Sequence, residues 1–273
     1  MTDLKRRIME ARKYVRSKTK TKPDVAIILG TGLGGLAKQI SRPVRIPYNE
    51  IPNFPVSTVL GHSGELVVGR LSGKKVVAMN GRSHYYEGYS MEDVTFPLRV
   101  MRYLGAKRLI VSNAVGGMNP FHSRGDIVLI ADHINLMGDN PLIGPNDDTI
   151  GTRFPDMSEP YSERLLSLAE KTAIELKIKV HRGIFVAVAG PNLETRAEYR
   201  FLRGIGADTV GMSTVPEVIA ARHMNMEVLG LSIVTDLCLP DALAPADHIE
   251  IMKAAQKAEP RLTRLVKEVL KRL

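Results

Sequence analysis

The feature that most constrains the fold is a series of short, nearly continuous apolar runs rich in β-branched residues. Six such runs occupy residues 25–29, 75–79, 108–111, 127–130, 183–189 and 228–234. Runs without polar alternation are typical of strands buried on both faces of a sheet. Helical patterns lie between several of them, over residues 94–103, 162–176 and 215–223. The alternation of strands and helices predicts an α/β layered fold.

Two further segments complete the organisation of the chain. It opens with a predicted amphipathic helix, in which Leu4, Ile8, Ala11 and Val15 repeat at helical spacing among basic residues. Residues 137–160 are rich in Gly, Pro, Asn and Asp and have no periodicity, which favours a long functional loop over a linker. No internal repeat or domain boundary is evident, so a single domain is expected.

The formal net charge of +9 is concentrated in the two terminal segments. Residues 1–22 carry nine Lys or Arg against two acidic residues, and residues 253–273 carry seven against two. The pattern favours solvated helical faces over a nucleic-acid-binding surface, because tryptophan is absent and no aromatic residues interleave the basic ones for base stacking. Nucleic acid is therefore not expected as a partner, whereas small acidic or phosphorylated substrates remain compatible with the charge.

Cysteine content and hydropathy indicate the compartment. The single cysteine, Cys238, excludes an internal disulfide framework, and residues 2–7 contain no apolar core of a signal peptide. Charged residues interrupt every hydrophobic run well before the roughly 18 apolar residues needed to span a bilayer. A cytoplasmic protein that does not insert into membranes is expected.

A glycine-rich turn follows the first apolar run. Residues 30–35, GTGLGG, match the pattern G-x-G-x-x-G, which points backbone N–H groups and a helix N-terminus at an anion. Thr31 adds a hydroxyl donor for a bound phosphate. A dinucleotide site also requires an acidic residue on a second strand, and Glu50 has about the right spacing, but Pro47 and Pro52 make that strand doubtful. Phosphate binding is preferred, followed by a dinucleotide site and then by a purely structural turn.

A second cluster of polar residues follows the run at residues 75–79. Arg82 and His84 are two residues apart, so in an extended chain both side chains face the same way and can hold one oxyanion, with Tyr86 next along that face. A lone Arg or His more often has a surface or core role, but ligands of α/β sheets gather at the carboxyl ends of strands. His62, within GHSG at residues 61–64, is a weaker candidate.

Small residues and two carboxylates provide the remaining candidates. Asn113 and Ala114 follow a predicted strand, and Ser213 precedes a predicted helix, so their amides and hydroxyl can approach an anion; tight packing turns are the alternative. Glu194 and Asp236 each end a predicted strand and place a carboxylate near the same pocket. The alternatives are helix capping for Glu194 and an exposed loop position for Asp236.

Together these segments resemble the trimeric, low-molecular-mass purine nucleoside phosphorylases, from the glycine turn to about His248. The motifs that carry the resemblance are GTGLG at 30–34, GH at 61–62, RSHYYEG at 82–88, NA at 113–114, DHIN at 132–135, RFP at 153–155, GPNLET at 190–195 and GMSTVPE at 211–217. The resemblance implies one nucleoside phosphorylase domain over residues 1–273. Its fold would be α/β, with three layers and a central mixed, largely parallel β-sheet flanked by helices.

The resemblance also implies roles for the candidate residues. Members of the family cleave purine (2′-deoxy)nucleosides with inorganic phosphate as co-substrate, giving free base and α-(deoxy)ribose 1-phosphate in purine salvage, without metal or organic cofactor. Phosphate would be held by Thr31, His62, Arg82, His84, Asn113, Ala114 and Ser213. The nucleoside would contact Tyr86, Phe154, Leu193, Glu194, Met212, Asp236 and His248. Glu194, Asp236 and His84 would be catalytic, and Phe154 would reach into the neighbouring site of a homotrimer.

Two departures from the family pattern concern the substrate. Members specific for 6-oxopurines usually carry Asn where this chain has Asp236, and the related methylthioadenosine phosphorylases use aspartate there. Thr31 replaces a common serine and is also seen in that branch. Glu194 and His248 favour ordinary nucleosides, since His248 offers a polar partner to a 5′-hydroxyl. Inosine and guanosine are therefore expected as substrates, with adenosine also cleaved. The alternative within the family is a methylthioadenosine-type preference for 6-aminopurines. Outside the family, the alternative hypotheses are a dinucleotide-dependent oxidoreductase and a nucleic-acid-binding protein.

Overall fold

The computed structural model describes residues 2–30, 34–56 and 64–273. Its strands form one sheet in the order β2-β3-β4-β1-β5-β8-β7-β6-β9. The strands are β1 (Val25–Leu29), β2 (Ser41–Pro47), β3 (Glu65–Leu71), β4 (Lys74–Asn80), β5 (Arg108–Gly117), β6 (Ile127–Leu136), β7 (Val180–Val188), β8 (Thr209–Gly211) and β9 (Glu227–Leu237). The last strand, β9, also pairs with β5, so β5, β8, β7, β6 and β9 close into a ring.

Parallel and antiparallel pairs are mixed in this sheet. The pairs β1–β4, β1–β5, β5–β9, β6–β7 and β7–β8 are parallel, and β2–β3, β3–β4, β5–β8 and β6–β9 are antiparallel. The prediction of a mixed sheet is confirmed. Closure of the ring was not predicted, because it depends on β9 pairing with two strands at once.

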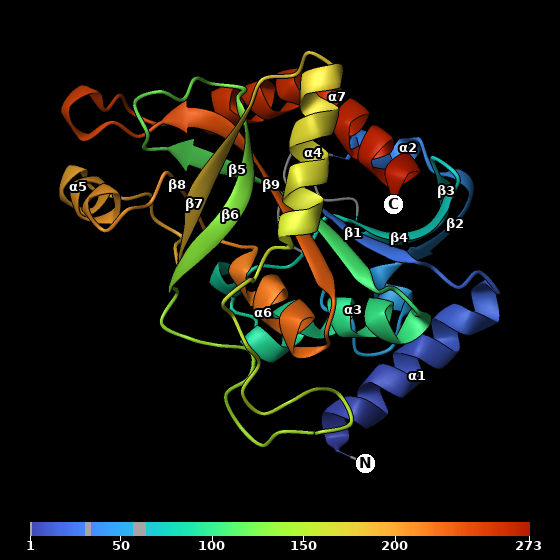
Figure 1. Cartoon of the computed structure of the whole chain (residues 1–273). Coiled ribbons are helices and arrows are strands. Elements are labelled where there is room, and N and C mark those ends of the chain that lie inside the picture. The colour runs from blue at the N-terminus through green and yellow to red at the C-terminus, as the bar shows by residue number, and fades with distance from the viewer. Residues whose placement is uncertain (1, 31–33, 57–63) are drawn as a thin grey trace.

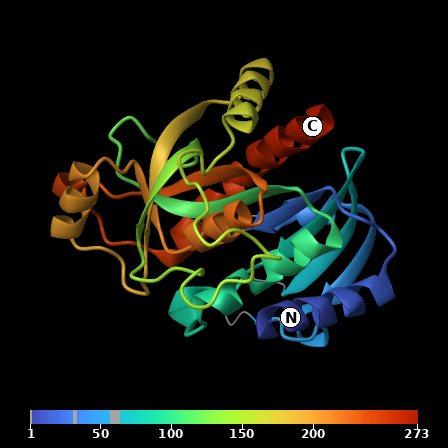
Figure 2. The same cartoon turned by 60° about the horizontal axis from the view of Figure 1, so that its bottom comes forward.

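Helices cover both faces of the sheet (Figures 1 and 2). The helices are α1 (Asp3–Lys18), α2 (Gly35–Lys38), α3 (Met91–Leu104), α4 (Glu163–Glu175), α5 (Arg196–Gly204), α6 (Val215–His223) and α7 (His248–Arg272). In Figure 1, α1, α3 and α6 lie below the sheet and α2, α4 and α7 above it, while α5 lies at the end toward which the arrowheads of β5 and β9 point. The predicted arrangement, a central sheet between layers of helices, is confirmed.

Burial explains which strands the sequence revealed. All five residues of β1 are buried, which agrees with its unbroken apolar run. By contrast, β2 is mostly exposed and β8 has three residues, so neither has an apolar run to reveal it. The predicted strand at residues 108–111 was too short, since β5 continues to Gly117. Residues 112–117 are therefore strand and not the predicted loop.

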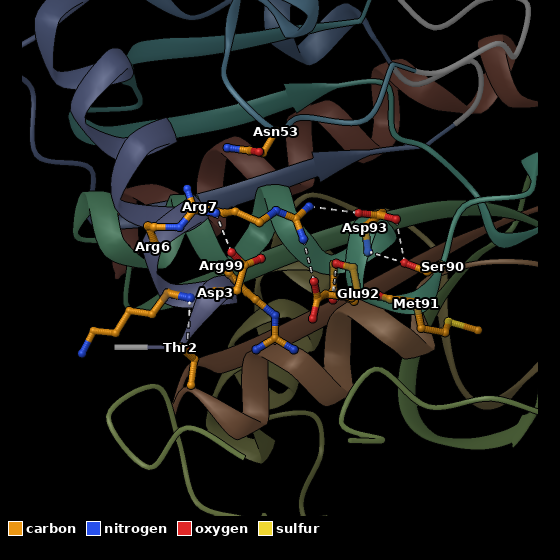
Figure 3. Close-up of polar contacts among 12 residues, drawn as sticks. Thr2, Asp3, Arg6, Arg7, Asn53, Ser90, Met91, Glu92, Asp93 and Arg99 are labelled. Atoms are coloured by element: carbon orange, nitrogen blue, oxygen red, sulfur yellow. Dashed lines mark hydrogen bonds and ion pairs between the residues drawn. The ribbon is translucent and has the colours of Figure 1, made fainter. Parts of the chain in front are cut away.

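The first helix is amphipathic, as predicted, and buries Ile8, Ala11 and Val15. Its basic face is partly used for docking (Figure 3): Arg7 donates from Nη1 to Glu92 at 2.7 Å and from Nη2 to Asp93 at 3.2 Å. Both acidic residues lie in the first turn of α3, where the helix dipole also favours negative charge. Part of the positive charge near the N-terminus thus forms ion pairs that connect α1 to α3 within one layer.

Candidate active site

Ten of the predicted site residues line one cavity of about 170 Å³ that opens to solvent. They come from the segment after β4, from β5, from the loop after β7, from the segment after β8 and from the end of β9. The ten are Arg82, His84, Tyr86, Asn113, Ala114, Leu193, Glu194, Met212, Ser213 and Asp236. Residues more than 150 positions apart in the chain thus meet at one end of the sheet.

Buried contacts fix the guanidinium of Arg82, which is 2% exposed. Its Nη1 donates to Glu217 Oε1 at 3.1 Å, and its Nη2 donates to the Ser112 carbonyl at 2.6 Å. Glu217, in the first turn of α6, is also 2% exposed. A buried charge next to an opposite charge keeps its orientation, because any displacement would leave the charge without compensation in a low dielectric.

The turn that begins α6 is strained. Thr214 has φ 73° and ψ −50°, and the Val215 N–H donates to the Ser213 carbonyl at 2.8 Å, which together define a γ-turn with positive φ. A β-branched residue rarely adopts this conformation. The Thr214 hydroxyl accepts from Asn113 Nδ2 at 2.9 Å and from Arg82 Nη1 at 3.4 Å. The turn therefore positions Ser213 beside the two predicted phosphate ligands.

His84 is held by an acidic partner and an aromatic ring. Its Nδ1 lies 3.0 Å from Glu87 Oε1, and its backbone N–H donates to the same oxygen at 2.7 Å. Because a carboxylate only accepts, Nδ1 carries the proton in this contact. The ring stacks on Tyr86 with centroids 4.7 Å apart. Burial raises the pKa of Tyr86 to about 12, so its hydroxyl stays protonated at neutral pH.

Glu194 lies six residues beyond the end of β7, so the prediction that it ends a strand is wrong. The capping alternative is also wrong, since Thr195 caps α5 in a reciprocal arrangement with Glu198. The carboxylate of Glu194 instead faces the cavity. Burial raises its pKa, while a hydrogen bond from Tyr199 acts in the opposite direction.

Asp236 lies within β9, one residue before the strand ends, and not on an exposed loop. Its Oδ1 accepts from the Thr235 hydroxyl at 3.0 Å and its Oδ2 from the Cys238 thiol at 3.1 Å. Both carboxylate oxygens therefore have a protein donor, and their remaining lone pairs are available to a ligand.

Seven residues of the cavity wall were not among the candidates. They are Val115, Gly116, Tyr199, Val210, Thr235, Cys238 and Ile251. Alternation along a longer strand would have indicated Gly116, two residues beyond Ala114 in β5. The same two-residue spacing beyond Asp236 would have indicated Cys238. We find no local signal for Tyr199, which reaches the cavity from α5.

Four predicted site residues are not placed in this cavity. Thr31 and His62 lie outside the described residues. The backbone of His248 begins α7, but its side chain is not described. Phe154 lies in the loop between β6 and α4, is 84% exposed and has the guanidinium of Arg153 over its ring at 5.6 Å. Residues 137–160 contain neither helix nor strand, as predicted.

Two searches of the described residues bear on other kinds of site. No group of three or more His, Cys, Asp or Glu side chains in ranges 2–30, 34–56 and 64–273 has an arrangement that could hold a metal ion. In the same ranges, every helix is too short or too polar to cross a membrane.

Known proteins resemble this chain over nearly its whole length. Residues 24–271 match the phosphorylase superfamily model. The chain is 51% identical over 266 residues to purine nucleoside phosphorylase 1 of Geobacillus stearothermophilus, with 97% of each chain covered. It is 47% identical over 261 residues to the purine nucleoside phosphorylase of Bos taurus, covering 93% of this chain and 90% of that one.

Comparison with solved structures finds the same kind of relative. A crystal structure of the Schistosoma mansoni purine nucleoside phosphorylase in complex with inosine has a TM-score of 0.94 at 40% identity, covering 98% of this chain and 96% of that one. The crystal structure of the S. mansoni protein in complex with adenosine has a TM-score of 0.93 at 41% identity, covering 97% of this chain and 96% of that one. The chain therefore belongs to the phosphorylase superfamily and, within it, to the purine nucleoside phosphorylases, which are pentosyltransferases.

Proposed function

We propose that this purine nucleoside phosphorylase cleaves inosine, guanosine and their 2′-deoxy forms with inorganic phosphate, and that it also accepts adenosine. The observation that carries the proposal is the polarity of one cavity. Cationic and hydroxyl donors, Arg82 and Ser213 among them, lie at one part of its wall, and the carboxylates of Glu194 and Asp236 lie at another. A phosphate anion and a purine, joined by the ribose, match that division. The related S. mansoni protein has been solved with inosine and with adenosine.

The phosphate subsite stabilises charge that develops in the reaction. Cleavage of a glycosidic bond passes through an oxocarbenium-like sugar, and a phosphate held beneath C1′ stabilises that cation and then forms the new C–O bond. Arg82, His84 and Ser213, with the backbone at Asn113 and Ala114, hold the phosphate. Because Glu217 and Glu87 already orient the first two side chains, little reorganisation is needed as the charges change.

The base subsite accepts hydrogen bonds from the departing purine. As the C1′–N9 bond breaks, its electron pair passes to the purine, which takes up a proton from solvent at N7, so that a new N7–H donor forms as the base departs. Glu194 accepts from N1–H of a 6-oxopurine, and Asp236 lies near the 6- and 7-positions. Hydrogen bonds that strengthen in the transition state raise kcat as well as kcat/KM. Leu193, Met212 and Tyr86 provide the surfaces against base and ribose.

The remaining roles follow the family pattern. We propose that the chain acts as one domain over residues 1–273 and forms a cytoplasmic homotrimer, in which Phe154 covers the ribose bound to a neighbouring subunit. Its exposed ring, remote from the cavity of its own chain, is what such a role requires. Thr31 and His62 would complete the phosphate subsite, and His248 would contact the ribose 5′-hydroxyl.

The direct test is to incubate the protein with inosine, guanosine, adenosine and methylthioadenosine, each with and without phosphate. We expect purine release from the first three only with phosphate, and no effect of a chelator. Equal release in phosphate-free buffer would identify a hydrolase instead. Preference for methylthioadenosine over adenosine and inosine would favour the 6-aminopurine alternative.

A matched pair of variants tests the phosphate subsite. Ser213→Ala removes one hydroxyl from the cavity without changing the Arg82–Glu217 pair, and the KM for phosphate should rise by about tenfold. Ser41→Ala is the control, because its hydroxyl donates to the Arg70 carbonyl on the exposed β2–β3 edge. Equal KM values for phosphate in both variants would exclude Ser213 as a phosphate ligand.

A further inference from the structure

Two residues outside the family motifs discussed above connect the carboxylates of the base subsite. Tyr199 lies on α5, and Cys238 follows the last residue of β9. Both are buried, with 3% and 1% of their surface exposed, and both line the cavity next to Glu194 and Asp236. Neither has a role in the mechanism described so far.

Cys238 is positioned as a hydrogen-bond donor to Asp236. Its Sγ lies 3.1 Å from Asp236 Oδ2, and burial raises the pKa of the thiol far above its usual range, so the sulfur keeps its proton at neutral pH. The sulfur also packs against the backbone of β5: a Cβ at Gly116 would lie 2.5 Å from it. The thiol is thus held against the carboxylate from the opposite strand.

The Thr235 hydroxyl, which is the other group in contact with Asp236, cannot by itself keep a hydrogen-bond donor on the carboxylate. The Thr235 hydroxyl lies 3.0 Å from Asp236 Oδ1 and 3.2 Å from the Val115 carbonyl, and both oxygens are acceptors when Asp236 is ionised. A hydroxyl has one proton, so it satisfies one acceptor at a time. When that proton turns to Val115, Oδ1 receives no hydrogen bond from Thr235, whereas the Cys238 thiol still donates to Oδ2.

Tyr199 extends the connection to the second carboxylate. Tyr199 lines the same cavity wall as these two groups, and its hydroxyl affects the pKa of both the Glu194 carboxyl and the Cys238 thiol. The titratable and charged groups that line the cavity with Asp236 are Arg82, His84, Tyr86, Glu194, Tyr199 and Cys238, and those of the adjoining chamber include Arg124, Asp247 and Glu250.

We propose that Cys238 is a specificity-determining positioning residue, whose thiol donates to Asp236 Oδ2 and keeps the carboxylate oriented as an acceptor in the base subsite. A carboxylate acceptor matches the 6-amino group of adenine and opposes the O6 of hypoxanthine. The thiol therefore extends the substrate range toward 6-aminopurines. This inference rests on the proposed function.

The test compares two substitutions of one residue. Cys238→Val removes the donor at similar volume, and Cys238→Ser retains a donor. The measurement is kcat/KM for inosine and for adenosine at neutral pH and saturating phosphate. In Cys238→Val we expect the inosine-to-adenosine ratio to rise about threefold or more. Cys238→Ser should stay within about twofold of the unsubstituted protein.

Other outcomes would overturn the inference. An unchanged ratio in Cys238→Val, or the same change in Cys238→Ser, would show that the residue acts by packing alone. Should Cys238→Val fail to fold, Cys238→Ala gives the same comparison. The double variant Asp236→Asn/Cys238→Val measures the coupling: once the carboxylate is replaced, loss of the thiol should change the inosine-to-adenosine ratio much less than it does beside Asp236.

A measurement of binding separates this inference from the proposed function. Calorimetry with free adenine and hypoxanthine reports base preference without turnover. A protein that releases no base from any nucleoside refutes the proposed function, whereas the ratio of the two binding constants still tests Cys238. We expect Cys238→Val to bind hypoxanthine relatively more tightly, by about threefold or more. No change in that ratio refutes the inference whatever the activity.

Discussion

Replacement of Asp236 by Asn should convert the base subsite to one that prefers 6-oxopurines. The orientation of the new amide follows from its two neighbours. The Cys238 thiol, 3.1 Å from Oδ2, requires an acceptor, so the amide oxygen takes that position. The amide nitrogen then faces the Thr235 hydroxyl, which can accept from it because its own proton can turn to the Val115 carbonyl at 3.2 Å. One N–H remains directed into the cavity.

The magnitude follows from exchanging one repulsive contact for one hydrogen bond. An ionised carboxylate opposite O6 offers no donor, whereas the outward N–H of Asn donates to it. The 6-amino group of adenine loses an acceptor at the same time. A hydrogen bond of this kind contributes about 1.4 kcal/mol or more, so the inosine-to-adenosine ratio of kcat/KM should rise by roughly tenfold or more.

The assay is initial-rate phosphorolysis of both nucleosides at saturating phosphate, with the phosphate KM measured in parallel. The phosphate KM should not change, because Asp236 lies at the base end of the cavity. A ratio that is unchanged or lower in Asp236→Asn would show that residue 236 does not recognise the 6-position. A rise in the phosphate KM equal to the loss of activity would instead indicate general distortion of the site.

Three further predictions concern other residues. Phe154→Ala should raise the nucleoside KM more than it changes the melting temperature, because the ring is exposed, and a monomer with full activity by light scattering and assay would contradict the trimeric site. Burial raises the pKa of Glu194, so kcat/KM for inosine should decline as pH falls through that raised value, and Glu194→Gln should abolish this decline. Above the raised pKa the ionised carboxylate destabilises the fold, so Glu194→Gln should also unfold at a higher temperature at neutral pH. An unaltered decline at acid pH would exclude Glu194 as the titrating group. Glu217→Gln leaves the buried Arg82 without its carboxylate, and urea unfolding without phosphate should show a loss of about 3 kcal/mol; a loss below about 1 kcal/mol would mean that the pair does not stabilise the fold.

The local sequence pattern was sufficient to predict the bounds of elements that are buried along most of their length. The bounds of β1 and α6 agree with the prediction to the residue, because β1 is apolar throughout and Pro216 marks the first turn of α6. Short polar motifs near predicted strand ends indicated eight of the residues that share the cavity, and the family resemblance added Leu193 and Met212. Both results depend on properties that a few neighbouring residues carry by themselves.

Tertiary structure decided what depends on pairing between distant strands. In the register of β5 with β9, Gly116 lies opposite Asp236, after an irregularity that follows Val115. That register closes the ring and packs the Cys238 thiol against Gly116 of β5. The burial of Glu217 against Arg82, 135 residues away, has the same origin. The sequence by itself determined which chemical groups are available and which runs become strands. Their partners were decided by strand register and helix packing, because a hydrogen bond between distant residues leaves no trace in the spacing of either one.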